Sequence, residues 1–194
     1  MMMGRQVRSI MVGTDMISSA ITLQRARPWY MNDTDGSNLA IDNAITLKEL
    51  FRGRLVAVFG VPAPFTGTCT NEHYPGYRAI ADELKATYGV DEIVCYSVSD
   101  PYAHHGWSRS LQNDDARITF LSDPDGAFAG AYGIDQSYDG VSLGRRSIRF
   151  SMIVYDGTVM NFRKIVDRAA DDAATLLQEV KEMRENLGTL KGEE

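Results

Sequence analysis

The feature that most constrains this chain is a strand-to-loop-to-helix transition beginning at Leu55. Leu55–Phe59 is an unbroken apolar run, which is typical of a strand buried on both faces of a sheet. A loop with two prolines follows. From Cys69 onward, apolar residues recur at three- and four-residue steps, at Tyr77, Ile80, Ala81 and Leu84. The pattern therefore predicts a central strand that leads into an amphipathic helix.

The segments after this unit extend the alternation of strands and helices. Glu92–Ser99 predicts a second strand. Asp100 followed by Pro101 is typical of a helix start, and we expect this helix to end at about Leu111. A short strand is predicted over 118–121 and a turn over 122–126. Phe150–Tyr155, the turn Asp156-Gly157 and Thr158–Ile165 predict a hairpin, and Ala169 to about Asn186 predicts a closing helix.

The N-terminal third gives weaker signals. They are strand-like residues at Ile21–Ala26 and Pro28–Tyr30, a turn cluster over 32–37, and a short helix or turn at Thr46–Phe51. Parallel strands joined through helices, followed by an antiparallel pair and a helix, describe a thioredoxin-like α/β sandwich with a central mixed sheet flanked by helices. We expect one domain over 21–187, a flexible or targeting extension over 1–20, and a loose tail over 188–194.

Charge and apolar patterning narrow the classes of partner. The longest apolar stretch, Leu55–Phe65, contains two prolines and is much shorter than the roughly 20 residues of a membrane-spanning helix, so we expect no membrane partner. The net charge is −6. Residues 1–30 carry four arginines and one aspartate, so the remainder carries −9. An acidic body repels phosphate backbones, which disfavours nucleic acid as a partner.

Compartment is predicted from the cysteines and the N-terminal residues. Two cysteines in 194 residues do not form a disulfide scaffold, and no secretory signal is visible, so a reducing, cytoplasmic location is expected. Residues 1–30 are basic, contain serine and are poor in acids. They fit either organellar targeting or a plain N-terminal extension.

The chemistry concentrates at Cys69, where the predicted strand has ended and the helix begins. The first N–H groups of a helix have no intrahelical partner, and the helix dipole places partial positive charge there, so both favour a thiolate. Thr66 lies three residues upstream, and Pro62 stiffens the loop. A second interpretation remains open, in which Thr66 and Thr68 only cap the helix while Cys69 packs as an inert core residue.

Several motifs resemble one family. The spacing Pro62-x-x-x-Thr66-x-x-Cys69 resembles the active-site motif of the peroxiredoxins, and the continuation His73–Tyr77 is similar to their type II subgroup. Further matches follow in the same order at 93–101, Trp107, 121–126 and 144–152, so that the resemblance covers roughly residues 45–160.

The resemblance implies a role for each matching residue. Cys69 would be the peroxidatic cysteine, which becomes a sulfenic acid. Thr66 would bind the substrate oxygens, Arg149 would stabilise the thiolate and the leaving oxygen, and Pro62 would shape the pocket. Support for the pocket is expected from Phe65, Thr68 and His73. The resemblance implies a homodimer, a hydroperoxide substrate and an external thiol reductant (glutathione, glutaredoxin or thioredoxin), with no metal and no organic cofactor.

Arg149 is also singled out by its own context. It opens a predicted strand whose following residues are mostly apolar, so its charged head must reach a polar or anionic partner at the strand end. Cys69 and His73, four residues apart, would also suit metal ligation or a Cys–His hydrolase. Only two other histidines occur, and no oxyanion-hole motif is visible, so both alternatives have weak support.

Cys95 leaves two interpretations open. It lies inside a predicted buried strand, where a free cysteine usually serves as core filler. Plant-like type II peroxiredoxins resemble this chain in having a second cysteine at a similar place, so Cys95 is a candidate second redox cysteine. No cysteine follows it, which favours recycling by an external thiol. The alternative function is a redox sensor or relay, in which Cys69 passes its oxidation to a partner protein.

Overall fold

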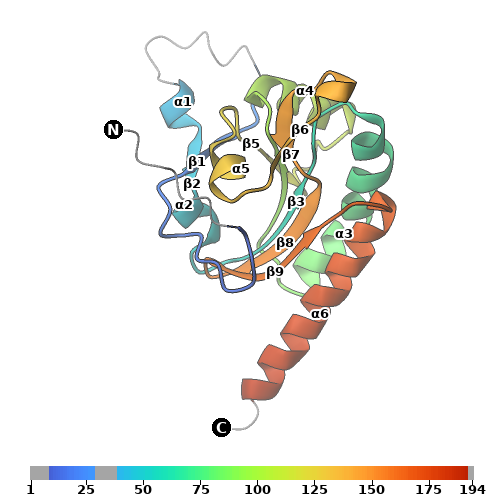
Figure 1. Cartoon of the computed structure of the whole chain (residues 1–194). Coiled ribbons are helices and arrows are strands. Elements are labelled where there is room, and N and C mark those ends of the chain that lie inside the picture. The colour runs from blue at the N-terminus through green and yellow to red at the C-terminus, as the bar shows by residue number, and fades with distance from the viewer. Residues whose placement is uncertain (1–8, 29–38, 192–194) are drawn as a thin grey trace.

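The computed structural model describes residues 9–28 and 39–191. Its centre is a seven-stranded sheet in the order β2-β1-β5-β4-β3-β8-β9 (Figure 1). Three neighbouring strands are parallel, namely β3 (Leu55–Gly60), β4 (Glu92–Ser97) and β5 (Thr119–Ser122). Antiparallel strands extend both edges, namely β1 (Thr22–Arg25), β2 (Ala44–Thr46), β8 (Phe150–Tyr155) and β9 (Thr158–Lys164). A separate ribbon pairs β6 (Asp135–Ser137) with β7 (Arg145–Ser147).

Helices cover both faces of the sheet. One face packs against η2 (Cys69–His73), α3 (Tyr74–Ala86), α4 (Pro101–Ser110) and α6 (Asp172–Lys191). The other packs against α2 (Leu47–Phe51) and α5 (Ala127–Ala131). The short elements are α1 (Leu39–Asp42), η3 (Asp139–Val141) and η4 (Ala169–Asp171). A mixed central sheet flanked by helices confirms the predicted thioredoxin-like fold.

The position of β3 explains its unbroken apolar run. Its side chains alternate between two cores, because Leu55, Ala57 and Phe59 pack under α3 and α6 while Val56 and Val58 pack on the opposite face. All six of its residues are buried. The strand lies between β4 and β8, so neither face and neither edge meets water. Its carboxyl end lies at the same edge of the sheet as those of β4 and β5, and the loop that follows it leads to Cys69.

The N-terminal boundary predicted at residue 20 is wrong for the part that the structure describes. The Gly13 N–H donates to the Val159 carbonyl and the Met16 N–H to the Gly157 carbonyl, both at 2.8 Å. The Met16 side chain is fully buried. Gly157 has φ +80°, and a Cβ there would lie 2.6 Å from Ile17, so the hairpin turn is shaped to receive this segment. Residues 9–20 belong to the domain.

The C-terminal tail also differs from the prediction. α6 continues to Lys191, about five residues past the predicted end, so the tail predicted as loose is helical over 188–191. The stretch contains no proline and consists mostly of good helix formers, and a single internal glycine, Gly188, is tolerated in a helix.

The turn cluster over 32–37 and most of Pro28–Tyr30 lie outside the described residues. No helix in the described part is both long enough and apolar enough to cross a membrane.

Candidate active site

Cys69 lies in the first turn of a helix, as predicted, and its side chain is 1% exposed. β3 ends at Gly60, a loop covers 61–66, and helical structure begins at Gly67. The Thr70 N–H donates to the Thr66 carbonyl at 2.9 Å, which closes the first turn around Cys69. The sulfur therefore lies where backbone donors and the helix dipole favour negative charge.

The turn that carries Cys69 is a π-helix, which the sequence pattern did not predict. The Tyr74 N–H donates to the Cys69 carbonyl five residues back. Pro75 follows at once, and a proline ring would clash with the carbonyl four residues earlier, that of Asn71. The wider turn relieves this clash. Because the apolar period continues through the segment, periodicity alone indicates an ordinary helix.

Arg149 contacts Cys69 directly. It immediately precedes β8, whose first residue, Phe150, pairs with Gly60 at the end of β3. A Cβ at Gly60 would lie 2.0 Å from the Phe150 ring, so only glycine allows this close approach. The guanidinium Nη2 of Arg149 donates to the Cys69 Sγ at 3.3 Å. The strand pairing therefore brings a cation to the sulfur.

His73 fixes the other end of the Arg149 guanidinium. The Arg149 Nη1 donates to the His73 Nδ1 at 3.0 Å, so Nδ1 is an acceptor and the ring proton lies on Nε2. That Nε2 donates to the Asp172 Oδ2 at 2.9 Å. His73 is fully buried, and burial lowers its pKa; Arg149 lowers it further, against the opposing effect of Asp172. The ring is therefore neutral and oriented.

Asp172 is the anionic end of this chain of hydrogen bonds. Its carboxylate, whose side chain is fully buried, also accepts from the Tyr77 hydroxyl at 2.6 Å and the Ser151 hydroxyl at 2.8 Å. Arg163 donates to it at 2.6 Å. Burial alone would raise the pKa of Asp172, but hydrogen bonds from His73, Tyr77 and Arg163 outweigh it and lower the pKa to about 2. The carboxylate is ionised.

Aromatic rings of the core pack against this network. The Phe59 ring stacks on Tyr77 with centroids 4.0 Å apart and meets the His73 ring edge-on at 5.2 Å. These contacts restrict both the histidine and the tyrosine that hold Asp172. The network is thus held by apolar packing and hydrogen bonds together.

The loop residues predicted for the site surround Cys69 in different ways. Pro62 is buried, and the Thr66 hydroxyl donates to the Ala63 carbonyl at 3.0 Å, which leaves its oxygen able to accept. Phe65 is 61% exposed with φ +60°, and its ring reaches toward Gly106 of α4. Thr68 is exposed and makes no side-chain cap. Thr68 therefore does not cap the helix.

Cys95 lies in the core next to the site without a bond to Cys69. It is fully buried on β4, opposite Phe59, and both cysteines are free. Its Sγ is 3.9 Å from the His104 Nε2, and the His104 Nδ1 is 3.1 Å from the Ser122 hydroxyl. Burial raises the pKa of Cys95 well above its ordinary value and lowers that of His104 to about 3. Both groups are neutral at pH 7.

Asp172 and Arg163 were not predicted from the sequence as residues of the site. A signal for Asp172 was present, because it falls on the same helical face as the apolar Leu176 and Val180, four and eight residues later. An acid on a buried face requires a partner. Within the described residues, no three side chains of His, Cys, Asp or Glu converge as metal ligands would.

Comparison with known proteins shows which family the chain belongs to. The Redoxin family model matches residues 33–177. The mitochondrial peroxiredoxin-2F of rice (Oryza sativa subsp. japonica) is 40% identical over 161 residues, which cover 81% of this chain and 77% of the relative. This chain is a type II peroxiredoxin. The peroxiredoxin-2F of Arabidopsis thaliana, also named mitochondrial, is 39% identical over 76% of this chain and 71% of its own length.

Solved structures place this peroxiredoxin in the same fold. Reduced Prx3 from Vibrio vulnificus, in complex with H₂O₂, superposes with a TM-score of 0.72 at 30% identity. The match covers 88% of this chain and 99% of that one. The chain is accordingly a thiol peroxidase.

Proposed function

We propose that Cys69 is the peroxidatic cysteine and that the enzyme reduces hydrogen peroxide and small alkyl hydroperoxides. The observation that carries this proposal is the 3.3 Å contact between the Arg149 Nη2 and the Cys69 Sγ in the first turn of a helix. The thiolate attacks the terminal peroxide oxygen, an S–O bond forms and the O–O bond breaks. The leaving alkoxide or hydroxide takes up a proton, and the sulfur, oxidised by two electrons, becomes a sulfenic acid.

Each residue around Cys69 has a separate role in this step. Arg149 offers its guanidinium to the sulfur and to the charge that develops on the leaving oxygen, without reorganisation. Thr66 accepts a hydrogen bond from the peroxide O–H through its hydroxyl oxygen, which stays able to accept while the hydroxyl donates to the Ala63 carbonyl. Pro62 closes the pocket against water. His73 holds Arg149 in place, because its Nδ1 engages the second guanidinium nitrogen.

The sulfenic acid is recycled by an external thiol. One thiol condenses with it to a mixed disulfide and water, and a second thiol releases reduced Cys69 and a disulfide. The location of Cys95 supports an external source, because a fully buried thiol in a central strand cannot move to Cys69 without opening the sheet.

Recycling by an external thiol is tested by measuring the steady-state peroxide turnover of the Cys95→Ser variant. We expect it to keep wild-type turnover with either glutathione and glutaredoxin or with thioredoxin. If Cys95→Ser loses turnover with every one of these reductants but still consumes the first equivalent of peroxide, Cys95 is the resolving cysteine and the proposal fails.

We further propose that the enzyme is a homodimer that covers Phe65. This large apolar side chain is 61% exposed beside the Cys69 loop, in a left-handed backbone conformation that costs free energy. Sedimentation velocity should give a dimer for the wild type and a shift toward monomer for Phe65→Ser. Monomeric wild-type protein at micromolar concentration would exclude the proposed homodimer.

For the cellular location we propose that any targeting signal lies before residue 9. Ile10, Met16 and Leu23 are buried in the core, and β1 is an integral strand, so removal of residues 1–30 would strip the domain of part of its sheet. The relatives from rice and Arabidopsis are named mitochondrial. A fluorescent fusion of the full chain, compared with one lacking residues 1–8, distinguishes organellar from cytoplasmic location.

A further inference from the structure

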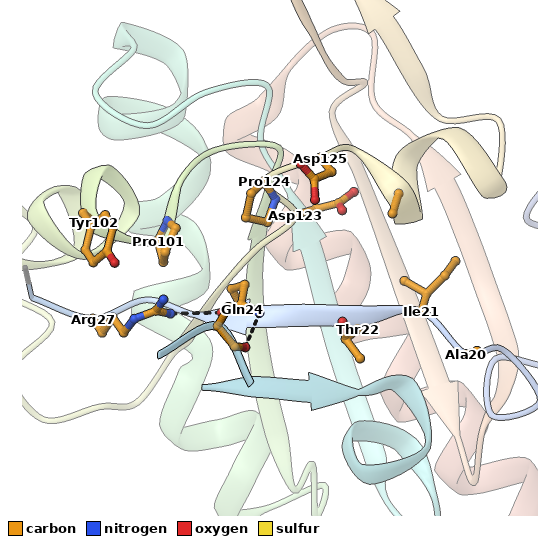
Figure 2. A pocket seen from close by; sticks show the side chains of 12 residues that line it. Ala20, Ile21, Thr22, Gln24, Arg27, Pro101, Tyr102, Asp123, Pro124 and Asp125 are labelled. Carbon is orange, nitrogen blue, oxygen red and sulfur yellow. Dashed lines mark hydrogen bonds between the residues drawn. The ribbon is translucent and has the colours of Figure 1, made fainter. Parts of the chain in front are cut away.

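A cavity of about 620 Å³ lies away from Cys69, between β1 and the turn after β5. Pockets of this size take small molecules. Figure 2 shows Arg27 at one end, Pro101 and Tyr102 from the start of α4 beside it, and the turn with Asp125 above β1. None of the twelve lining residues belongs to the network around Cys69.

Arg27 is a buried cation without a counter-ion in the described part of the chain. It is only 5% exposed. Its Nη1 donates to the Gln24 Oε1 at 3.1 Å and to the Arg25 carbonyl at 3.3 Å, and its guanidinium lies 5.3 Å from the centre of the Tyr102 ring. Its Nε has no hydrogen-bond partner. Its partners among the described residues are all neutral. A buried guanidinium without an anionic partner is costly, and an anion on the cavity side would offset that cost.

Asp125 supplies the opposite charge on another wall of the same cavity. It is exposed, and within the described residues no hydrogen bond or ion pair engages its carboxylate. The neighbouring Asp123 is different, because its carboxylate accepts from the Tyr96 hydroxyl at 2.7 Å and the Ala129 N–H at 3.0 Å. Within residues 9–28 and 39–191, neither Arg27 nor Asp125 has an ion-pair partner, so these two side chains give the cavity one positive and one negative charge that do not pair with each other.

We propose that this cavity binds a small zwitterion of the amino-acid class. The carboxylate of the ligand accepts from the Arg27 guanidinium, which lines the cavity. Its ammonium group faces Asp125, and its apolar body lies along Ile21, Pro101 and Pro124. A simple dianion is disfavoured, because Asp123 and Asp125 both line the same space.

Three probes of matched shape separate the contributions of the two charges. They are L-leucine, its deaminated form 4-methylpentanoate, and its decarboxylated form 3-methylbutylamine, each titrated calorimetrically into the reduced full chain. We expect leucine to bind most tightly, 4-methylpentanoate up to about fivefold more weakly, and the amine not to saturate. In ¹H–¹⁵N spectra the Arg27 Nε–H resonance shifts with leucine.

Matched variants test the assignment of residues. Arg27→Gln should weaken leucine binding at least tenfold, whereas Arg25→Gln, a change at an exposed arginine two residues earlier at the end of β1, should leave it unchanged. Asp125→Asn, an exposed change that does not threaten folding, should reduce leucine affinity to that of 4-methylpentanoate. The proposal is overturned if leucine gives no saturable binding up to about 10 mM, or if it binds Arg27→Gln or Asp125→Asn as it binds the wild type.

Discussion

Arg149 bridges Cys69 and His73, with one guanidinium nitrogen 3.3 Å from the sulfur and the other 3.0 Å from the histidine Nδ1. The Arg149 guanidinium beside the sulfur is therefore also fixed by its hydrogen bond to His73. His73 in turn is held by Asp172, a residue 99 positions later at the start of α6. The position of the Arg149 guanidinium beside Cys69 thus depends on contacts from the closing helix as well as from the strand that carries Arg149.

Arg149→Lys should slow the oxidation of Cys69 by hydrogen peroxide about 100-fold. A lysine keeps the charge but is a point donor, so it cannot engage the sulfur and His73 at once. Stopped-flow mixing of the reduced protein with peroxide measures the rate. Arg145→Lys, at an exposed position four residues earlier, is the control and should react at the wild-type rate.

Asp172→Asn should slow the same oxidation about tenfold and lower the free energy of unfolding by about 3 kcal/mol. The variant leaves Arg163 without one of its buried partners and weakens the acceptor that orients His73. Urea unfolding measures stability, and Asp171→Asn, at an exposed neighbour, is the control. A loss of stability with an unchanged rate of oxidation would show that Asp172 is purely structural.

The stability of the enzyme should decline as pH falls below 6.5, partly because of His104. Burial lowers the pKa of His104 to about 3, so between pH 6.5 and 3 the unfolded chain binds a proton there that the folded chain does not. Stability contributed by the neutral ring is therefore complete above pH 6.5 and is lost as pH falls toward 3. His104→Gln should reduce the slope of unfolding free energy against pH by about 1.4 kcal/mol per unit.

The measurement is urea unfolding at several pH values between 4 and 6. His105→Gln provides the comparison, since that ring is only half-buried and should change the slope less. Equal slopes for the wild type and His104→Gln would mean that the buried ring is protonated in the folded state.

Met16→Ala should cost about 2–5 kcal/mol of stability, as expected for a fully buried methionine. The loss arises because Met16 packs in the core against the β8–β9 side of the sheet. Met11→Ala, whose side chain is 62% exposed, should change stability by less than about 0.5 kcal/mol. If both variants match the wild type in thermal unfolding, residues 9–20 do not belong to the domain.

The central strand and the helix that carries Cys69 were predictable, because burial and helical period are local properties of the chain. The contact of Arg149 with Cys69 joins residues 80 positions apart, and spacing alone cannot supply it. It was expected only through the resemblance of motifs. The π-helical turn was missed because apolar period does not distinguish it from an α-helix.

Asp172 and the N-terminal segment were not predicted from the sequence for two further reasons. Asp172 has the position of an ordinary acid at a helix start. Only its spacing of four and eight residues from Leu176 and Val180 indicates that it lies on the buried face of the helix. Residues 9–20 attach to the hairpin mainly through backbone hydrogen bonds, which leave no periodic pattern in the side chains. Their two buried apolar residues, Ile10 and Met16, are too widely spaced to mark a strand or helix.

The most direct test of the account is a single turnover of the reduced enzyme with one equivalent of hydrogen peroxide. We expect rapid consumption of the peroxide, more than about 100-fold faster than by free cysteine, with one oxygen atom gained at Cys69 and trapped there by a sulfenic-acid reagent. Cys69→Ser should abolish the reaction, and Cys95→Ser should preserve it. Oxidation at the rate of an ordinary thiol, or an oxygen gained at Cys95 instead, would contradict the assignment of Cys69 as the peroxidatic cysteine.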